Sequence, residues 1–217
     1  GRLVSITPTF LKNLRSDMGE FLRKMAPLMV LTGLVALFSF ISPNFMTFNN
    51  IVLMLRQVSF ATISAVGIMF VMISGAIDLS IGSQIVFTNV VMAILMARHN
   101  VHPLFAVIIC LAMGTLLGMT NGFLGIQLKI HPLIITLGTA TIYKGLGYIA
   151  ANGQNINGLP ESFRVLGQGY LGVAPIPVLV MIIVAIIGSI VLTRTFFGRY
   201  VFALGGNEEA ARLAGVN

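Results

Sequence analysis

Apolar segments long enough to cross a bilayer recur along the chain and alternate with short polar stretches. A spanning helix needs roughly 20 apolar residues, within a range of about 17 to 25. The segments of this kind cover residues 25–42, 58–75, 82–97, 103–128, 131–151 and 176–193. The pattern therefore predicts an all-α polytopic membrane helical bundle with about six spans in this chain.

Three further stretches have a different pattern. Residues 10–25 can form an amphipathic helix at the cytoplasmic surface, a short helix with a mixed face is expected at 49–57, and residues 152–172 form a polar, Gly-rich loop. The sequence therefore divides into a cytoplasmic N-terminal amphipathic segment (1–24), a transmembrane domain (25–195) and a cytoplasmic C-terminal segment (196–217).

Composition places the chain in lipid. Hydrophobic residues make up 57% of its 217 residues, charged residues make up 9%, and the mean hydropathy is +0.97. Soluble domains have about a quarter of their residues charged. The protein is therefore interpreted as an integral protein of the lipid bilayer.

The distribution of basic residues indicates the orientation. Six spans put both chain ends on one face of the membrane, and nine of the 13 Lys and Arg residues fall on that face. Arg56, Arg98 and Arg164 fall on the opposite face, and Lys144 lies within the fifth span. Because Lys and Arg concentrate in cytoplasmic loops, both ends are expected in the cytoplasm.

The basic residues do not indicate nucleic acid as a partner, because they lie near span ends and are not interleaved with aromatic residues.

Candidate catalytic chemistry is absent from the sequence. The chain has no HExxH, GxSxG or Walker A pattern. Cys110 stands alone in an apolar segment, and His99, His102 and His131 do not have the spacing of a zinc site. We therefore expect no catalytic residue, no metal and no cofactor in this chain, which is interpreted as a non-enzyme.

The stretch "SGAIDLSIGS", residues 74–83, interrupts an otherwise uncharged region. Asp78 is the only ionisable side chain between residues 58 and 97. An isolated charge at the bilayer centre costs at least about 2.5–3.5 kcal/mol. One interpretation is a capping Asp at a tight turn, bonded to backbone N–H groups and to Ser80, with the third span starting near Gly82. The alternatives are a broken helix that lines a translocation pathway, and a proton or cation site.

Uncharged polar residues also lie within the spans. They either join helices or line a pathway for a hydroxyl-rich solute, and the set comprises Thr88, Asn89, Thr120, Asn121, Thr136, Thr139 and Thr141. Lys144 is interpreted as a snorkelling or packing residue, with a role in the pathway as the alternative. Gly114, Gly118 and Gly122 line one side of the fourth span and predict close packing of a neighbouring helix.

The stretch "NEEAARLAG" near the C-terminus predicts a short surface helix. Asn207 is a suitable N-cap, Glu208 and Glu209 suit the first turn, and Gly215 can end the helix. Glu208 and Arg212 have the favourable i, i+4 order. Directly after a membrane span, such a helix is typical of a docking element for another subunit.

Three stretches together resemble a known family. They are "GAIDLSIGS" at 75–83, "NGFLGIQLKIHPLIITLGT" at 121–139 and "FGRYVFALGGNEEAARLAGVN" at 197–217. In order and spacing they resemble the membrane permease subunit of bacterial ABC importers for monosaccharides, the ribose, galactose, xylose and arabinose group. Permeases for the autoinducer-2 signal are close relatives.

The resemblance implies roles for two sets of residues. The third stretch would contain the cytoplasmic coupling helix that contacts an ATPase subunit, through Gly206, Asn207, Glu209, Ala210, Ala211 and Gly215. The first two stretches, with one polar residue of the third span, supply candidates for the pathway lining, which are Asp78, Ser80, Asn89, Asn121 and Thr136.

The resemblance also implies partners and a location. ATP and Mg would be bound by the separate ATPase subunit, a second permease copy would complete a homo- or heterodimer, and a periplasmic sugar-binding protein would contact residues 152–172. The protein would be a multi-pass component of the cell inner membrane. Family members continue beyond the third stretch with further spans, so the chain is expected to be about two thirds of a subunit. The rival hypotheses are an ion-coupled secondary transporter that uses Asp78, an autoinducer-2 permease and a membrane scaffold.

Overall fold

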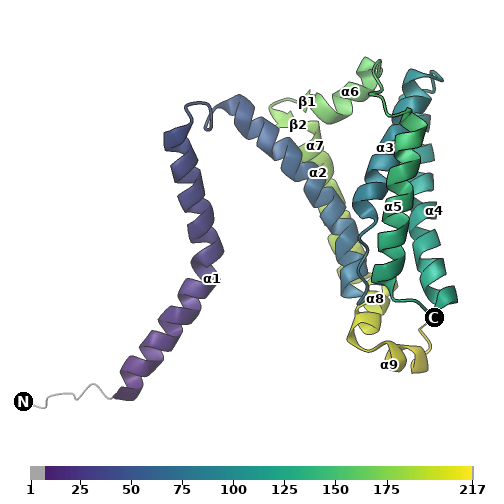
Figure 1. Ribbon diagram of the computed structural model, residues 1–217. Coiled ribbons are helices and arrows are strands. Elements are labelled where there is room, and N and C mark those ends of the chain that lie inside the picture. Colours follow the sequence, from purple (N-terminus) through teal and green to yellow (C-terminus); the bar gives the residue numbers. More distant parts are fainter. Residues whose placement is uncertain (1–7, 217) are drawn as a thin grey trace, which may run out of the picture. The chain divides into compact units, whose positions relative to one another are not determined.

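The computed structural model describes residues 8–216, with side chains from residue 21 onward. Most side chains of the expected amphipathic segment 10–25 therefore lie outside the described residues. The chain divides into two compact units, residues up to Met54 and residues from Leu55 onward. The first unit contains α1 (Pro8–Ile41), in which Pro27 is interior. A proline inside a helix removes one backbone hydrogen bond and bends the helix, and α1 is visibly bent (Figure 1).

The helix α2 (Phe48–Ile73) corrects one expectation from the sequence. The short helix expected at 49–57 and the second span expected at 58–75 are one continuous helix of 26 residues. No proline interrupts residues 48–73, so the helix that starts at Phe48 simply continues into the apolar stretch. Arg56 consequently lies within this long helix and not in a separate short one.

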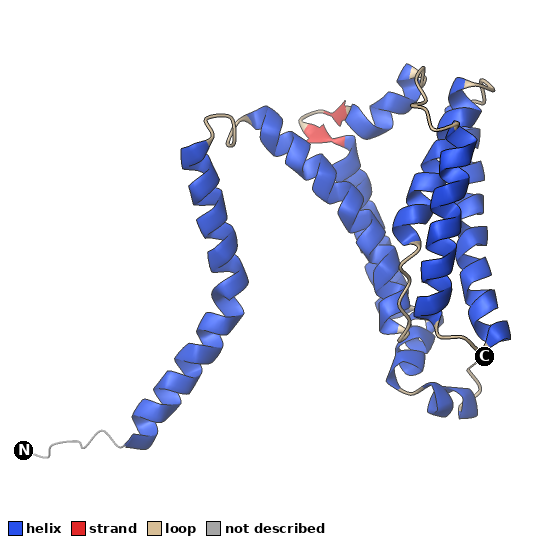
Figure 2. Cartoon of the chain, in the orientation of Figure 1, coloured by secondary structure: helices blue, strands red, loops and turns tan. Residues whose placement is uncertain are grey.

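The remaining long helices of the second unit are α3 (Ile81–Ala97), α4 (Pro103–Leu128), α5 (Pro132–Ala151) and α7 (Ile176–Arg194). Five helices of the described chain are long and apolar enough to cross a membrane, in α1, α2, α4, α5 and α7, and α3 is a shorter apolar helix of 17 residues. The all-α membrane bundle expected from the sequence is confirmed, with α3 as the one short span (Figure 2).

Two histidines that made no metal pattern have a structural role. His102 precedes Pro103 and His131 precedes Pro132, and each histidine is the N-cap of the following helix. The Nδ1 of each ring accepts a hydrogen bond from a backbone N–H at 3.3 Å, from Leu104 and Leu133 respectively. Proline at the first helical position needs no N–H partner, so the repeated His-Pro-Leu starts both α4 and α5.

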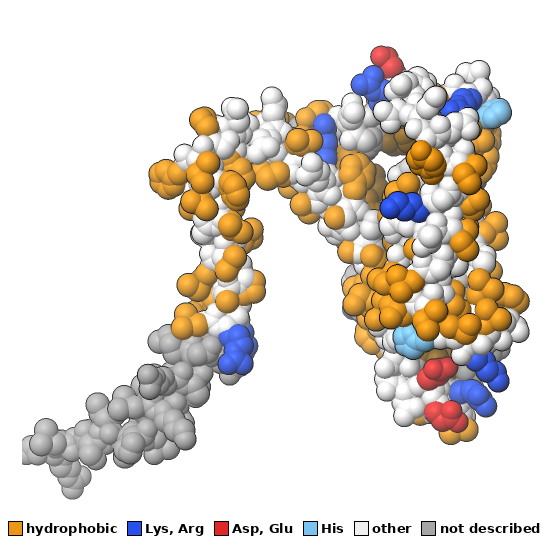
Figure 3. All heavy atoms as spheres, in the orientation of Figure 1, with side chains coloured by type: hydrophobic (Ala, Val, Ile, Leu, Met, Phe, Trp, Pro, Cys, Tyr) orange, Lys and Arg blue, Asp and Glu red, His pale blue; other side chains and the backbone are white. Residues whose placement is uncertain are grey.

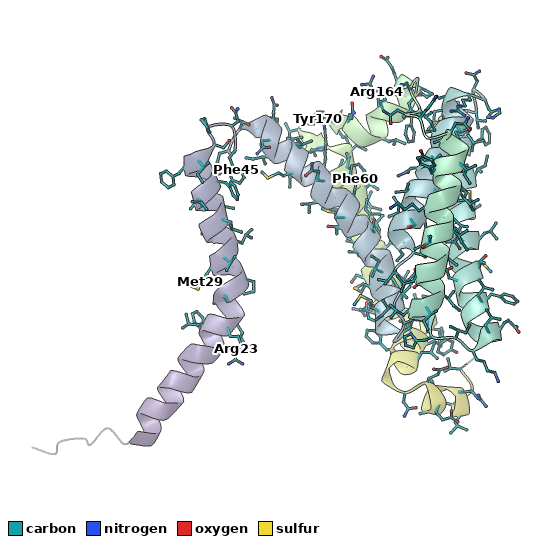
Figure 4. The ribbon with its side chains drawn as sticks, in the orientation of Figure 1. Arg23, Met29, Phe45, Phe60, Arg164 and Tyr170 are labelled. Atoms are coloured by element: carbon teal, nitrogen blue, oxygen red, sulfur yellow. The ribbon has the colours of Figure 1, made fainter. Side chains whose placement is uncertain are left out.

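The loop expected at residues 152–172 contains unexpected structure. It includes α6 (Glu161–Gln168) and the hairpin strand β1 (Tyr170–Leu171), which pairs with β2 (Ala174–Pro175). Arg56 of α2 holds this region, because its Nη2 donates to the Gln168 carbonyl at 2.6 Å and its guanidinium lies 4.9 Å from the centre of the Tyr170 ring. Arg164 and Tyr170 are labelled in this region in Figure 4.

The surface of the second unit matches a lipid environment. Large apolar side chains are exposed along its helices, including Leu111, Ile126 and Ile149, each at least two thirds exposed. Most charged side chains lie toward the ends of these helices, with a basic side chain part-way along them, and hydrophobic side chains cover much of the length between (Figure 3). Apolar exposure on this scale is expected where hydrocarbon replaces water as the solvent.

Glycines pack helices at positions that the sequence pattern did not single out. Of the expected stripe on α4, only Gly114 approaches another helix, since an added Cβ would lie 4.0 Å from Cγ2 of Thr88, whereas Gly118 and Gly122 have nothing within 4 Å. A tight contact is at Gly188 of α7, where a Cβ would lie 2.6 Å from Cγ1 of Val66 in α2. A glycine outside the α4 stripe therefore sets the close approach of α7 to α2 at this point.

We predict that Gly188→Ala lowers the thermal unfolding temperature of the purified protein in detergent. Overpacking of this kind lowers the free energy of unfolding by about 1–3 kcal/mol. Cγ1 of Val66 is one bond from its Cβ, so it cannot easily move aside. Val66→Ala added to the same chain should restore the unfolding temperature. Gly67→Ala, where an added Cβ meets nothing within 4 Å, is the matched control. A Gly188→Ala protein as stable as the Gly67→Ala control would contradict the contact.

Candidate functional site

The helix α2 ends in a closed turn at Gly75. The Gly75 N–H donates to the Met72 carbonyl and the Ala76 N–H to the Val71 carbonyl, both at 3.1 Å. Gly75 has a φ of +87°, which residues with a side chain rarely adopt. These two bonds and the left-handed glycine form a Schellman motif, so α2 is firmly terminated before the chain turns.

An irregular connection, residues 76–80, follows the turn and leads to α3. A helix of 17 residues is about 25 Å long, whereas the 26 residues of α4 extend about 39 Å. Five residues of connection can supply up to about 16 Å, which makes up the difference. The connection is anchored to interior positions of α4 and α5, so it lies beside those helices. The structure thus shows the helical pattern broken between α2 and α3, with the irregular backbone packed beside α4 and α5.

Asp78 orders the connection but does not cap α3 itself. Its Oδ1 accepts two hydrogen bonds from Ser80, from the backbone N–H at 2.7 Å and from the hydroxyl at 2.6 Å. The N-cap of α3 is Ser80, whose side chain makes no capping bond to the first turn of that helix. The bond expected between Asp78 and Ser80 is therefore confirmed. Asp78 lies two residues before the N-cap, so it does not itself cap α3 as the first interpretation expected.

The hydroxyl of Ser80 is the centre of the site. It is fully buried, donates to Asp78, and accepts from Nε2 of Gln84 and from Nδ2 of Asn121, each at 2.7 Å. A serine hydroxyl has one proton and two lone pairs. All three are used, so Ser80 joins the connection, α3 and α4 with no bonding capacity left for a solute in this conformation.

The helix α5 holds the connection from the other side. Oγ1 of Thr136 accepts from the Leu79 N–H at 3.2 Å and lies 3.4 Å from the Ile77 carbonyl. The Tyr143 hydroxyl donates toward Oδ1 of Asn121, at 3.2 Å. Buried polar groups are costly without partners, and here α4 and α5 supply them.

Four of the five candidate pathway residues come together in this network. Asp78, Ser80, Asn121 and Thr136 are joined directly or through one neighbour, whereas Asn89 is exposed on α3 outside it. Sequence reasoning missed two members of the network. Gln84 had a signal, because it lies four residues after Ser80 and so on the same helix face, but nothing in the sequence pairs Tyr143 with Asn121. Lys144 is exposed on α5, as a snorkelling residue would be.

The C-terminal segment forms two helices, α8 (Phe196–Gly206) and α9 (Glu208–Leu213). The expected cap is confirmed, since Oδ1 of Asn207 accepts from the Ala210 N–H at 2.9 Å. Gly215 follows α9 with a φ of +84°. Five of the candidate coupling residues are exposed, namely Gly206, Asn207, Glu209, Ala210 and Gly215.

Ala211 differs from the other coupling candidates. Its side chain is 5% exposed, so it packs within this chain and has no free surface to offer a partner here. The sequence placed Ala210 and Ala211 together as small residues, but successive residues on a helix face different directions. Of the two alanines, only Ala210 presents a free surface.

We predict that Asp78→Asn leaves the amount of folded protein near that of the unaltered chain. An amide Oδ1 can still accept both hydrogen bonds from Ser80. Asp78→Leu removes that acceptor and leaves a buried hydroxyl with one partner fewer, which costs about 1–3 kcal/mol. Monodisperse protein recovered after detergent extraction is the measurement. Equal yields from the Asn and Leu variants would show that Asp78 does not order the connection.

The comparisons with known proteins all find transport permeases, although the solutes in their names differ. A family model described as "Branched-chain amino acid transport system / permease component" matches residues 50–217. The chain is 36% identical to the ribose import permease protein RbsC of Haemophilus influenzae over 93% of this chain and 63% of that protein. It is 34% identical to the D-allose transport system permease protein AlsC of Escherichia coli, over 91% and 61%. It is 38% identical to the L-arabinose transport system permease protein AraH of the same species, over 80% and 53%.

The chain spans less than two thirds of the length of these curated relatives. No solved structure matches it. The family match extends from α2 through α9 and thus includes the whole network around Ser80 and the exposed face of α9. On this match, the chain belongs to the family of membrane permease components described by that model.

Proposed function

We propose that the chain is part of the membrane-spanning permease subunit of an ATP-driven importer, and that it forms the translocation pathway for a monosaccharide. The observation that carries the proposal is the similarity, over 80–93% of this chain, to permeases named for ribose, allose and arabinose. The helix break between α2 and α3 supports it, because irregular backbone within a membrane is typical of transporters.

The proposed partners are an ATPase subunit, a second permease copy and a periplasmic binding protein. The sequence has no nucleotide-binding motif, so the energy comes from an ATPase subunit that binds ATP and Mg. The exposed Ala210 and Glu209 of α9 form the contact with that subunit. A second permease copy completes the pathway, and a periplasmic binding protein delivers the sugar to α6 and the hairpin.

In this proposal the connection 76–80 borders the pathway. Among the described residues, Oδ1 of Asp78 is held by Ser80, and this leaves Oδ2 free to face water or a sugar hydroxyl. Because Ser80, Asn121 and Thr136 bond to one another and to the backbone, they shape the pathway wall and do not bind the solute in this conformation. An ion-coupled transporter that uses Asp78 is the rival, and it would need no ATPase subunit.

The chain is proposed to lie in the cytoplasmic membrane with both described ends on the cytoplasmic side. The nine-to-three distribution of basic residues supports this orientation. It puts α9 in the cytoplasm, where an ATPase subunit is available. It also puts α6 and the hairpin on the outer face, where a binding protein can reach them.

The orientation is tested with single cysteines in intact cells. Ser162 is exposed on α6 and Leu213 is 82% exposed on α9. We predict that Ser162→Cys reacts with a membrane-impermeant thiol reagent in intact cells, and that Leu213→Cys reacts only after permeabilisation. Cys110 is buried, and the unaltered chain measures its background. The opposite labelling pattern would reverse the topology.

The ATPase contact is tested in the full-length permease, reconstituted with its ATPase subunit and sugar-loaded binding protein. We predict that Ala210→Leu keeps α9 helical, since leucine is nearly as good a helix former as alanine. The added volume would hold the two surfaces apart and lower stimulated ATPase activity and uptake by at least about fivefold, the low end of typical coupling between sites.

The neighbouring alanine provides the comparison for this test. Ala211→Leu should instead lower the yield of folded permease, because overpacking a buried site costs about 1–3 kcal/mol. Ala210→Ser is the control that adds little volume. Normal stimulation with Ala210→Leu would remove α9 from the contact. If no ATPase subunit copurifies with the unaltered permease, the ion-coupled rival is favoured over the proposed function.

A further inference from the structure

Gly205 of α8 lies directly against the end of α2. A Cβ added to Gly205 would lie 2.9 Å from the carbonyl carbon of Ile73 and 3.4 Å from that of Ser74, and it would be closer still to the carbonyl oxygen of Ile73. These are backbone atoms, which cannot rotate away as a side chain can. Only glycine fits where two backbones approach this closely. The adjacent Gly206 is different, because a Cβ there would meet nothing within 4 Å.

The contact falls on the turn that ends α2. A Cβ added to Gly75, the left-handed residue of that turn, would lie 3.8 Å from the Cα of Gly205. One helical turn earlier on α2, the ring of Phe70 lies 6.0 Å from that of Phe197 in α8, at an interplanar angle of 38°. Two positions on α8 therefore contact the end of α2, and one lies near each end of α8.

This contact stands between the two candidate functional regions. On one side, the turn at Gly75 leads into the connection 76–80, which Thr136 and Ser80 fix to α5 and α4. On the other side, the Asn207 N–H donates to the Ala203 carbonyl of α8 while the Asn207 side chain caps α9. Asn207 alone separates the two helices, so α8 and α9 form one short, bonded segment.

We propose that Gly205 is a positioning residue through which movement of α9 reaches the connection 76–80, with Phe197 as a second contact. This inference rests on the proposed function, in which an ATPase subunit moves α9. Helix shifts in such transitions are only about 1–2 Å. A side chain between α8 and α2 could absorb a shift of that size by changing rotamer, whereas backbone in direct contact with backbone has no rotamer to change and passes the shift on.

The test compares Gly205 with Gly67 in the full-length permease, reconstituted with its ATPase subunit and binding protein. Gly205→Ala should separate α8 from the turn at Gly75. We expect copurification of the ATPase subunit and basal ATPase activity to persist, while stimulation by sugar-loaded binding protein and uptake fall at least about fivefold. Gly67→Ala, in α2 where an added Cβ meets nothing within 4 Å, should stay within about twofold of the unaltered complex. Loss of coupling without loss of assembly is the result that a purely structural glycine would not give.

Two neighbouring phenylalanines provide a second test if Gly205→Ala does not fold. Phe197 and Phe196 are both more than half exposed, at 59% and 72%, and only the ring of Phe197 stacks on Phe70. Phe197→Ala should lower stimulation while Phe196→Ala does not. The inference is overturned if Gly205→Ala is stimulated normally, if both glycine variants lose stimulation equally, or if Phe197→Ala behaves as Phe196→Ala does. Failure of the proposed function gives a different result, because the unaltered complex would then show no stimulation of ATPase activity by sugar-loaded binding protein. That result would also overturn the inference.

Discussion

Backbone that leaves the helical pattern inside a bilayer must find partners within the protein, because hydrocarbon offers none. In this chain the hydroxyl of Ser80 meets that requirement for the connection between α2 and α3. It is buried and fully bonded, to Asp78 before it, to Gln84 after it and to Asn121 in α4. This one group ties the connection and the first turn of α3 to α4, and Thr136 adds the contact with α5.

The break is rigid at both of its ends. Gly75 closes α2 with a Schellman motif, and the two bonds from Ser80 to Asp78 order the approach to α3. Gly205 abuts the first of these ends, where no side chain fits between the helices. The connection between α2 and α3 is thus held in one conformation by hydrogen bonds at both of its ends. In the proposed function, this property would let the connection respond to small displacements of α9.

Composition and apolar length predicted the spans well, since a helix exposed to lipid requires about 20 apolar residues whatever its neighbours are. The cap at Asn207 was equally readable, because its partners lie within four residues. Features that depend on three-dimensional neighbours were not. The hairpin and α6 are polar and short, Tyr143 meets Asn121 only across two helices, and Ala211 differs from Ala210 by the direction of one side chain. The glycine stripe of α4 misled for the same reason, since periodicity shows which residues share a face but not whether another helix covers it.

The partners of the connection are far from it in the sequence, and this affects how the protein is made. The bond from Asn121 to Ser80 spans 41 residues and the bond from Leu79 to Thr136 spans 57. At about 5–20 residues per second, the ribosome delivers those partners only seconds after residue 80 has emerged. During that interval only the bonds within Asp78, Ser80 and Gln84 are available to this stretch. The local turn therefore shields the polar groups of a half-made membrane protein until α4 and α5 arrive beside it.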